Sequence, residues 1–387
     1  MKITRVTPIF ANRYLYVQIE TDEGLIGTGE CGAWGHLEAA ATAVGKFATY
    51  LIGKDPGRIE THWTVMHRFG HFTGAAICGA ISAIDIALWD IKGQALGVPI
   101  HVLLGGPTRD RVRVYAHVKS PTKDEMIDAA LQRKDQGYTA IGHLNPFLDE
   151  AKSEVYTRGH ARKIDEAVQV IADIRAAVGP DMDLCVEIHR RLTPPEATAF
   201  AREIAQFRPM FYEDPIPPTS TEAMGRVADN IGIPLATGER FFSLYQFQAH
   251  IQRGALDYAR VSLCLCGGIT GARKIAALAE AHDIQVVPHN PLSPISLLAC
   301  LQLDAAISNF AIQELPLVTQ KDGATGHENR LRGSDLVDWT PDIRDGYLSI
   351  PQGPGLGAGL ANAAYSAENV VREIEMRPHL DGSFIDQ

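Results

Sequence analysis

The chain repeats one short pattern eight times, and this repetition limits its fold more than any other feature of the sequence. Between residues 112 and 315, short apolar runs alternate with segments whose apolar residues recur at helical spacing, such as 163–179 and 271–282. Eight strand–helix units over about 200 residues are what a (β/α)8 barrel requires. A doubly wound sheet fits less well, because the chain lacks a glycine-rich nucleotide turn. The predicted strands are 112–118, 138–144, 183–189, 210–215, 234–239, 257–263, 284–289 and 310–315.

The residues on either side of the barrel follow other patterns. Residues 1 to about 50 resemble a strand meander, and residues 74–97 have the spacing of a long helix that stops at Gly97. We therefore predict an α/β protein, a modified (β/α)8 barrel over residues 112–334 with an α+β capping domain over residues 1–111. Residues 335–387 lack the barrel pattern, and we expect them to return to the capping domain.

Composition excludes several classes of partner. The net charge is −10 and the chain has no basic run, so a nucleic acid is not an expected partner. It has no apolar run of the roughly 18 residues that a membrane-spanning helix needs, and its start does not resemble a signal peptide. The six cysteines are scattered and form no zinc-binding pattern. We expect a cytoplasmic protein that does not bind a membrane.

Glutamates end three consecutive predicted strands. Glu187, Glu213 and Glu239 close the third, fourth and fifth strands, and the intervals from 187 to 213 and from 213 to 239 are both 26 residues. Active sites of such barrels lie at the carboxyl ends of the strands, so the three carboxylates should meet at one rim. They would repel one another without a cation, and hard divalent ions take oxygen ligands. We predict a Mg²⁺ site; the alternative is three unrelated surface glutamates.

A set of motifs spread over nearly the whole chain resembles the enolase superfamily, and within it the mandelate racemase-like sugar-acid dehydratases. The motifs are "IDIALWDIKG", "LLGG", "VEIHRRLTPPEA", "FYEDPIPP", "LATGERFFS", "CGGITGARKIAALAEAHDI", "VPHNPLSPISLLAC" and "QELP". The resemblance implies a capping domain built from both termini, Mg²⁺ held by the three glutamates, a small acid-sugar substrate and a homo-oligomer. It also implies a shared first step, removal of the proton α to a carboxylate to give an enediolate.

The base for that step is expected at the seventh strand. His289 ends this strand, and histidine suits proton abstraction because its ordinary pKa lies near neutral pH. Many relatives pair this histidine with an aspartate at the end of the sixth strand, where this chain has Ser262. Racemases and several dehydratases carry a lysine near the end of the second strand, where this chain has Gly142. The alternative for His289 is a packed histidine at a strand end.

The second chemical step needs an acid, because hydroxide is a poor leaving group. His189 lies two residues after Glu187, so on a strand both side chains would point to the same face. The resemblance implies that His189 protonates the leaving hydroxyl. It also implies that Glu314, at the end of the eighth strand, donates a hydrogen bond to the substrate oxygens if it is protonated. The alternative for Glu314 is a solvated glutamate.

Substrate-binding residues are expected in two places. Trp34 and His36 lie in a loop of the capping domain, where the family sets its specificity. His143 and Asn145 follow the second strand, and Tyr156 and Arg158 lie in the loop beyond it. Tyr156 and Arg158 resemble a tyrosine and an arginine of mannonate dehydratases; their alternative is a solvated loop.

The function expected from these features is Mg²⁺-dependent dehydration of an aldonic or related sugar acid to a 2-keto-3-deoxy acid. An epimerase or cycloisomerase of a sugar acid is the alternative within enzymes, because it shares the first step. A non-catalytic barrel that binds a sugar acid is the alternative outside enzymes. Ser262 and Gly142 stand where many relatives carry an aspartate and a lysine that support catalysis.

Overall fold

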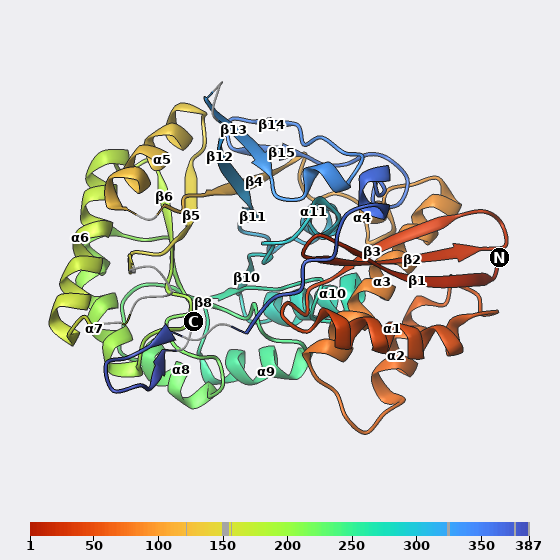
Figure 1. The fold of residues 1–387 in the computed structure, drawn as a ribbon, viewed down its shortest axis with the longest axis horizontal. Coiled ribbons are helices and arrows are strands. Elements are labelled where there is room, and N and C mark those ends of the chain that lie inside the picture. Colours follow the sequence, from red (N-terminus) through yellow and green to blue (C-terminus); the bar gives the residue numbers. More distant parts are fainter. Residues whose placement is uncertain (121, 149–154, 156, 323–325, 375–376, 386–387) are drawn as a thin grey trace.

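The structure, a computed structural model, describes all of the chain except residues 121, 149–154, 156, 323–325, 375–376 and 386–387. The cap lies at one end of the molecule and the barrel at the other (Figure 1). In the cap, an antiparallel meander is followed by helices, as the sequence predicts. Its elements are β1 (Ile3–Ala11), β2 (Tyr14–Thr21), β3 (Ile26–Cys31), α1 (Leu37–Leu51), α2 (Ile59–Arg68), α3 (Ala75–Leu96) and α4 (Ile100–Leu103).

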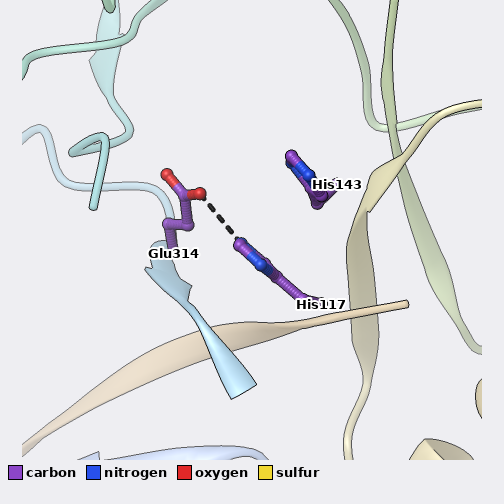
Figure 2. A group of neighbouring side chains, drawn as sticks. All are labelled: His117, His143 and Glu314. Carbon is purple, nitrogen blue, oxygen red and sulfur yellow. Dashed lines mark hydrogen bonds and ion pairs between the residues drawn. The ribbon is translucent and has the colours of Figure 1, made fainter. Parts of the chain in front are cut away.

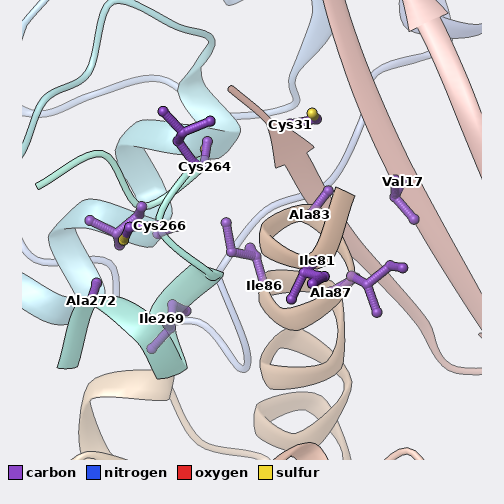
Figure 3. Packing of buried hydrophobic residues seen from close by; sticks show 14 of the residues in the cluster. Val17, Cys31, Ile81, Ala83, Ile86, Ala87, Cys264, Cys266, Ile269 and Ala272 are labelled. Carbon is purple, nitrogen blue, oxygen red and sulfur yellow. The ribbon is translucent and has the colours of Figure 1, made fainter. Parts of the chain in front are cut away.

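The helix α3 is buried almost all round because it packs between the cap sheet and the barrel. Gly29 of β3 allows the close approach, since a Cβ there would lie 2.0 Å from the carbonyl oxygen of Ala83. On its other side α3 meets the segment 264–272, and the two parts share one hydrophobic cluster (Figure 3). The predicted stop is confirmed, because Gly97 ends α3 in the left-handed conformation with φ +68°.

The eight predicted barrel strands all form, and successive strands pair in parallel up to β10, where one isolated parallel bridge joins Val286 to Phe310, three residues before β11. The eighth strand pairs with the first, which closes the barrel. The strands are β4 (Arg111–His117), β5 (Ala140–Leu144), β6 (Asp183–Glu187), β7 (Phe211–Glu213), β8 (Leu235–Thr237), β9 (Tyr258–Ala259), β10 (Gln285–Val286) and β11 (Gln313–Leu315).

Each of the first seven barrel strands is followed by a helix. These are α5 (Lys123–Asp135), α6 (His160–Val178), α7 (Pro194–Ile204), α8 (Thr221–Ala228), α9 (Leu244–Arg253), α10 (Gly268–Glu280) and α11 (Pro294–Ala306). In the described residues the eighth strand leads instead to a hairpin of β12 (Leu317–Asp322) and β13 (Gly326–Leu331). The barrel is modified in this respect, because a β-hairpin instead of a helix follows its eighth strand.

The C-terminal segment divides between the two units. β14 (Ile343–Arg344) and β15 (Tyr347–Ser349) extend the barrel sheet, because β15 pairs with β4. The return to the cap is in place by residue 355: Gly355 exchanges backbone hydrogen bonds with Val98 and Ile100, and Asn12 does so with Glu368 and Val370. A short pair, β16 (Arg377–Pro378) and β17 (Phe384–Ile385), ends the chain. The expected return therefore does not apply to residues 343–349, whose strand-forming pattern is too short to stand out.

Two further expectations concern the whole chain. All six cysteines are buried and unpaired, and Cys264 and Cys266 lie in the shared core, which agrees with their interpretation as small apolar residues. No helix in the described part of the chain is both long and apolar enough to cross a membrane.

Candidate metal centre and active site

Three buried glutamates meet at the carboxyl rim of the barrel. Glu187 and Glu213 end the adjacent strands β6 and β7 and are register partners, and Glu239 follows β8 by two residues. One carboxylate oxygen from each lies within 4.8 Å of the others. The structure therefore brings together the three residues that the spacing placed at one rim.

Cationic groups of the protein surround this carboxylate cluster. His143 Nδ1 lies 2.5 Å from one oxygen of Glu187, and His189 Nε2 lies 2.9 Å from the other. Arg190 Nη1 lies 2.5 Å from Glu239. Burial raises the pKa of Glu187, but the charges of His143 and His189 outweigh burial and hold that pKa well below its usual range.

Glu213 behaves differently from Glu187. Its pKa lies well above the usual range because of burial, and the nearby charges of Glu187 and Glu239 raise it further although Arg260 lowers it. Arg260 Nε donates to Glu213 at 2.5 Å, so one direct cationic partner does not offset the crowding. Three oxygen donors with unbalanced negative charge fit a hard divalent cation.

His189 reaches Glu187 in a way that strand alternation does not explain. β6 ends at Glu187, and His189 has a left-handed backbone with φ +58°. A turn, not a continued strand, therefore brings the imidazole back to the carboxylate. Glu187 raises the pKa of His189, and the side chain is 37% exposed, so it is open to a ligand.

His289 lies on the opposite flank of the cluster, with Nε2 3.3 Å from Glu239. Its Nδ1 is buried and has no hydrogen-bond partner among the described residues, so Ser262 does not replace the missing aspartate there. Burial lowers the pKa of His289. Burial therefore makes His289 a weaker base than a solvated histidine.

Glu314 does not suit the role expected of it. His117 and Arg260 bind its two oxygens at 2.8 and 2.6 Å, and the backbone N–H of Asn290 donates to it at 2.7 Å. Burial raises its pKa, but Arg260 and His117 bring that pKa well below its usual range. The protonated form that could donate a hydrogen bond is thus disfavoured, and Glu314 instead anchors Arg260 and His117. Figure 2 shows the contact with His117.

A bulge after the second barrel strand explains the missing lysine. The β5–β6 register shifts between Ile141 and Leu144, and His143 has φ +51°. A Cβ on Gly142 would lie 2.3 Å from the ring of Tyr115, so no side chain fits at that position. The bulge turns His143 into the barrel instead, where its ring stacks on that of His117 with centroids 4.7 Å apart.

Two of the remaining expected substrate residues make local contacts after β5. Asn145 accepts the N–H of Phe147 and stabilises the turn after β5. Arg158 binds the carbonyl of Leu148 and the carboxylate of Glu166. Tyr156 lies outside the described residues.

In the cap loop, His36 is exposed and directly precedes α1. Trp34 is 40% exposed and lies under the guanidinium groups of Arg13 and Arg372.

Sequence reasoning missed three charged or ionisable residues of the site. Arg260 follows β9 directly, Arg190 follows His189, and His117 ends β4. Like the three glutamates, His117 is a polar residue at the end of a predicted strand, and this position could have identified it. Nothing in the sequence distinguished Arg260 and Arg190 from surface arginines, because their burial depends on carboxylates from other strands.

A barrel with a carboxylate triad at its rim and a cap made from both termini defines an enzyme of the enolase superfamily. Two family models match: "Mandelate racemase / muconate lactonizing enzyme, N-terminal domain" over residues 2–105, and "Enolase C-terminal domain-like" over residues 125–364. The chain belongs to the mandelate racemase/muconate lactonizing enzyme family.

Individual relatives agree with this assignment. The chain is 38% identical to a D-galactonate dehydratase from Verminephrobacter eiseniae, over 94% of this chain and 93% of that protein. It is 40% identical to a D-galactonate dehydratase from Xanthomonas oryzae pv. oryzae, over 92% and 91%. An enolase from Agrobacterium radiobacter with bound Na and L-malate has a TM-score of 0.89 at 29% identity, with all of both chains covered. The predicted enzyme class, a hydro-lyase of sugar acids, is confirmed.

Proposed function

We propose that the chain dehydrates an aldonic or related sugar acid to a 2-keto-3-deoxy acid, with Mg²⁺ held by Glu187, Glu213 and Glu239. The observation that carries this proposal is the buried carboxylate triad with a histidine on each flank. The relatives named D-galactonate dehydratase make a hexonic acid the first substrate to test. A divalent cation at the triad would stabilise the negative charge that develops on the substrate carboxylate.

The protein groups divide the proton transfers between them. His289 removes the α proton, and its lowered pKa keeps the imidazole neutral and able to accept it. His189 donates a proton to the leaving hydroxyl, and the raised pKa of its ring favours the charged form that can do so. Opposite protonation states on the two flanks suit an elimination better than a racemisation through two bases.

Arg260 and His117 position the site. Arg260 joins Glu213 to Glu314 and is almost fully buried, so it fixes both carboxylates. His117 supports His143 by stacking, and His143 in turn contacts Glu187. The rigid array keeps the triad in place before substrate enters.

The test is a screen of aldonic acids with Mg²⁺, followed by detection of 2-keto acid as the semicarbazone and measurement of α-proton exchange in deuterium oxide. We expect a keto acid from at least one hexonic acid, and its loss with a chelator. Exchange without keto acid would indicate an epimerase, and neither signal from any acid would contradict the proposal. Analytical ultracentrifugation of the same sample measures the expected homo-oligomer.

A further inference from the structure

Three arginines from distant parts of the chain gather at the cap. Arg13 lies between β1 and β2, Arg332 follows β13, and Arg372 lies in the C-terminal segment. The backbone bonds of Asn12 to residues 368 and 370 hold that segment against the β1–β2 turn. The guanidinium carbons of Arg13 and Arg372 lie 3.9 and 4.7 Å from the ring centre of Trp34.

None of these three arginines has a carboxylate partner among the described residues. Nε and Nη2 of Arg13 are buried and have no acceptor. Burial and the nearby charge of Arg332 lower the pKa of Arg13 to about 10. The neighbouring carboxyl of Glu30 is already bound by Ser293 Oγ at 2.6 Å and by the N–H of Ser296.

An unpaired guanidinium is costly to bury, and two further unpaired guanidinium groups nearby increase that cost. The chain as a whole carries a net charge of −10, so three uncompensated arginines at one place stand apart from its general surface. An anion that binds here gains charge-assisted, bidentate hydrogen bonds from guanidinium groups that no carboxylate of the described residues neutralises.

This arginine cluster lies next to the catalytic loop. Arg332 Nη1 donates to the carbonyl of Pro291 at 3.4 Å, two residues after His289. The same loop continues to Ser293, whose hydroxyl donates to Glu30 of the cap strand β3. The loop that carries His289 to the triad is thus also the loop that Arg332 of the cluster contacts.

We propose that Arg13, Arg332 and Arg372 bind a second anionic group of the substrate, so that the preferred substrates are dianionic sugar acids. The inference rests on the proposed function, in which the first carboxylate faces the glutamate triad. Two kinds of substrate share the required chemistry: an aldaric acid, with a carboxylate at its far end, and an aldonic acid phosphorylated there.

The first experiment compares matched six-carbon acids with the full chain and Mg²⁺. Galactonate and gluconate are the monoanions, galactarate and glucarate the dicarboxylates, and 6-phosphogluconate the phosphate ester. We expect kcat/KM at least tenfold higher for one dianionic class than for the monoanions, and the class preferred identifies the group bound. Higher kcat/KM for the monoanions would overturn the inference and leave the proposed function standing.

The second experiment replaces Arg13 and Arg372 singly by Met, which keeps an apolar stem. We expect kcat/KM for the dianionic substrate to fall about 10- to 100-fold, the usual effect of a charge-assisted bond, and that for a monoanion to change less than about threefold. The control is Arg58→Met, an exposed arginine of the cap at the start of α2. Equal losses for both substrate classes would mean that the arginines only support packing.

A binding measurement does not depend on turnover. Adipate and hexanoate have equal chain lengths and no hydroxyl to eliminate, so NMR titration of the two reports the second charge alone. We expect tighter binding of adipate in the wild type, and loss of this preference in Arg372→Met, whose exposed position makes a folding defect small. No preference in the wild type overturns the inference, even if no acid tested gives a keto acid.

Discussion

The cap and the barrel rim bury the same kind of side chain in opposite ways. Asp85 of the cap is 1% exposed, and its carboxylate accepts the N–H of Thr270. Burial raises its pKa to about 7. Glu187 of the rim is 5% exposed but faces His143 and His189, which outweigh burial and lower its pKa.

The partners of a buried carboxyl group therefore distinguish a structural acid of the cap from an acid of the candidate active site. Asp90 in the cap also has backbone partners, the N–H groups of Thr28 and Leu356, and its pKa rises to about 6 because of burial. Neutral donors satisfy an acid without keeping it charged. The rim instead places histidine and arginine side chains against Glu187 and Glu239, which lowers the pKa of both, whereas burial still raises the pKa of Glu213.

Removing one charge from the triad should have the largest effect. In Glu213→Gln we expect Mg²⁺ affinity to fall at least 100-fold and kcat/KM at least about 1,000-fold, because the ligand set and its charge are incomplete. Calorimetric titration measures the Mg²⁺ affinity, and the keto-acid assay measures kcat/KM. The control is Glu222→Gln on α8, whose side chain is 78% exposed. Unchanged Mg²⁺ binding in Glu213→Gln would make the rim acids structural, like those of the cap.

Replacing His189 should separate the two proton transfers. In His189→Asn we expect dehydration to fall about 100- to 10,000-fold while α-proton exchange continues, because His289 performs the first step. Deuterium incorporation by NMR, run beside the keto-acid assay, checks this, with exposed His282→Asn as the control. If exchange disappears together with dehydration, His189 is not a dedicated acid.

Breaking the Arg260 bridge should affect stability as well as activity. Arg260→Met leaves Glu213 and Glu314 buried without their shared cation, and we expect a loss of about 3–5 kcal/mol in the free energy of unfolding. Urea unfolding with a chelator present measures it. The matched control is Arg253→Met, whose partners Glu222 and Asp229 are exposed, and for which a clearly smaller loss is expected because solvent screens the pairs. Similar losses in both variants would contradict the special position of Arg260.

The smallest effect concerns the cap and its dependence on pH. The folded pKa of Asp85, about 7, lies above its unfolded value of 3.8. The folded state therefore binds the proton more tightly, and the contribution of Asp85 to stability is full below pH 3.8 and is lost as pH rises towards 7. We expect Asp85→Asn to remove about 2–3 kcal/mol of the stability lost between pH 5 and pH 8. Urea unfolding at the two pH values, compared with the wild type, checks the sign; equal pH dependence would contradict it.

The same comparison shows what the sequence predicts well. The triad followed from spacing because parallel strands bring their carboxyl ends to one rim, so Glu187, Glu213 and Glu239 needed no further information. The meander and the stop at Gly97 followed from local patterns. These are features that depend on periodicity or on one residue's backbone preference.

Features that depend on the shape of neighbouring side chains were not predictable. His143 enters the barrel only because a bulge reverses its direction, and Gly142 is required by the ring of Tyr115 on another strand. The protonation state of Glu314 could not be predicted because it depends on Arg260 and His117, which come from strands remote in sequence. Charge balance in a buried site is a property of the assembled rim.

The position of α3 has a consequence for protein engineering. Ala83 and Ile86 of this helix share a core with Cys264 and Ile269 of the barrel (Figure 3). Because interiors are closely packed, a chimaera that takes residues 1–105 from another family member will carry mismatched volumes into this interface unless 264–272 is exchanged as well. The β1–β2 turn lies outside that core, so grafting this turn alone is the route by which substrate preference is most easily altered.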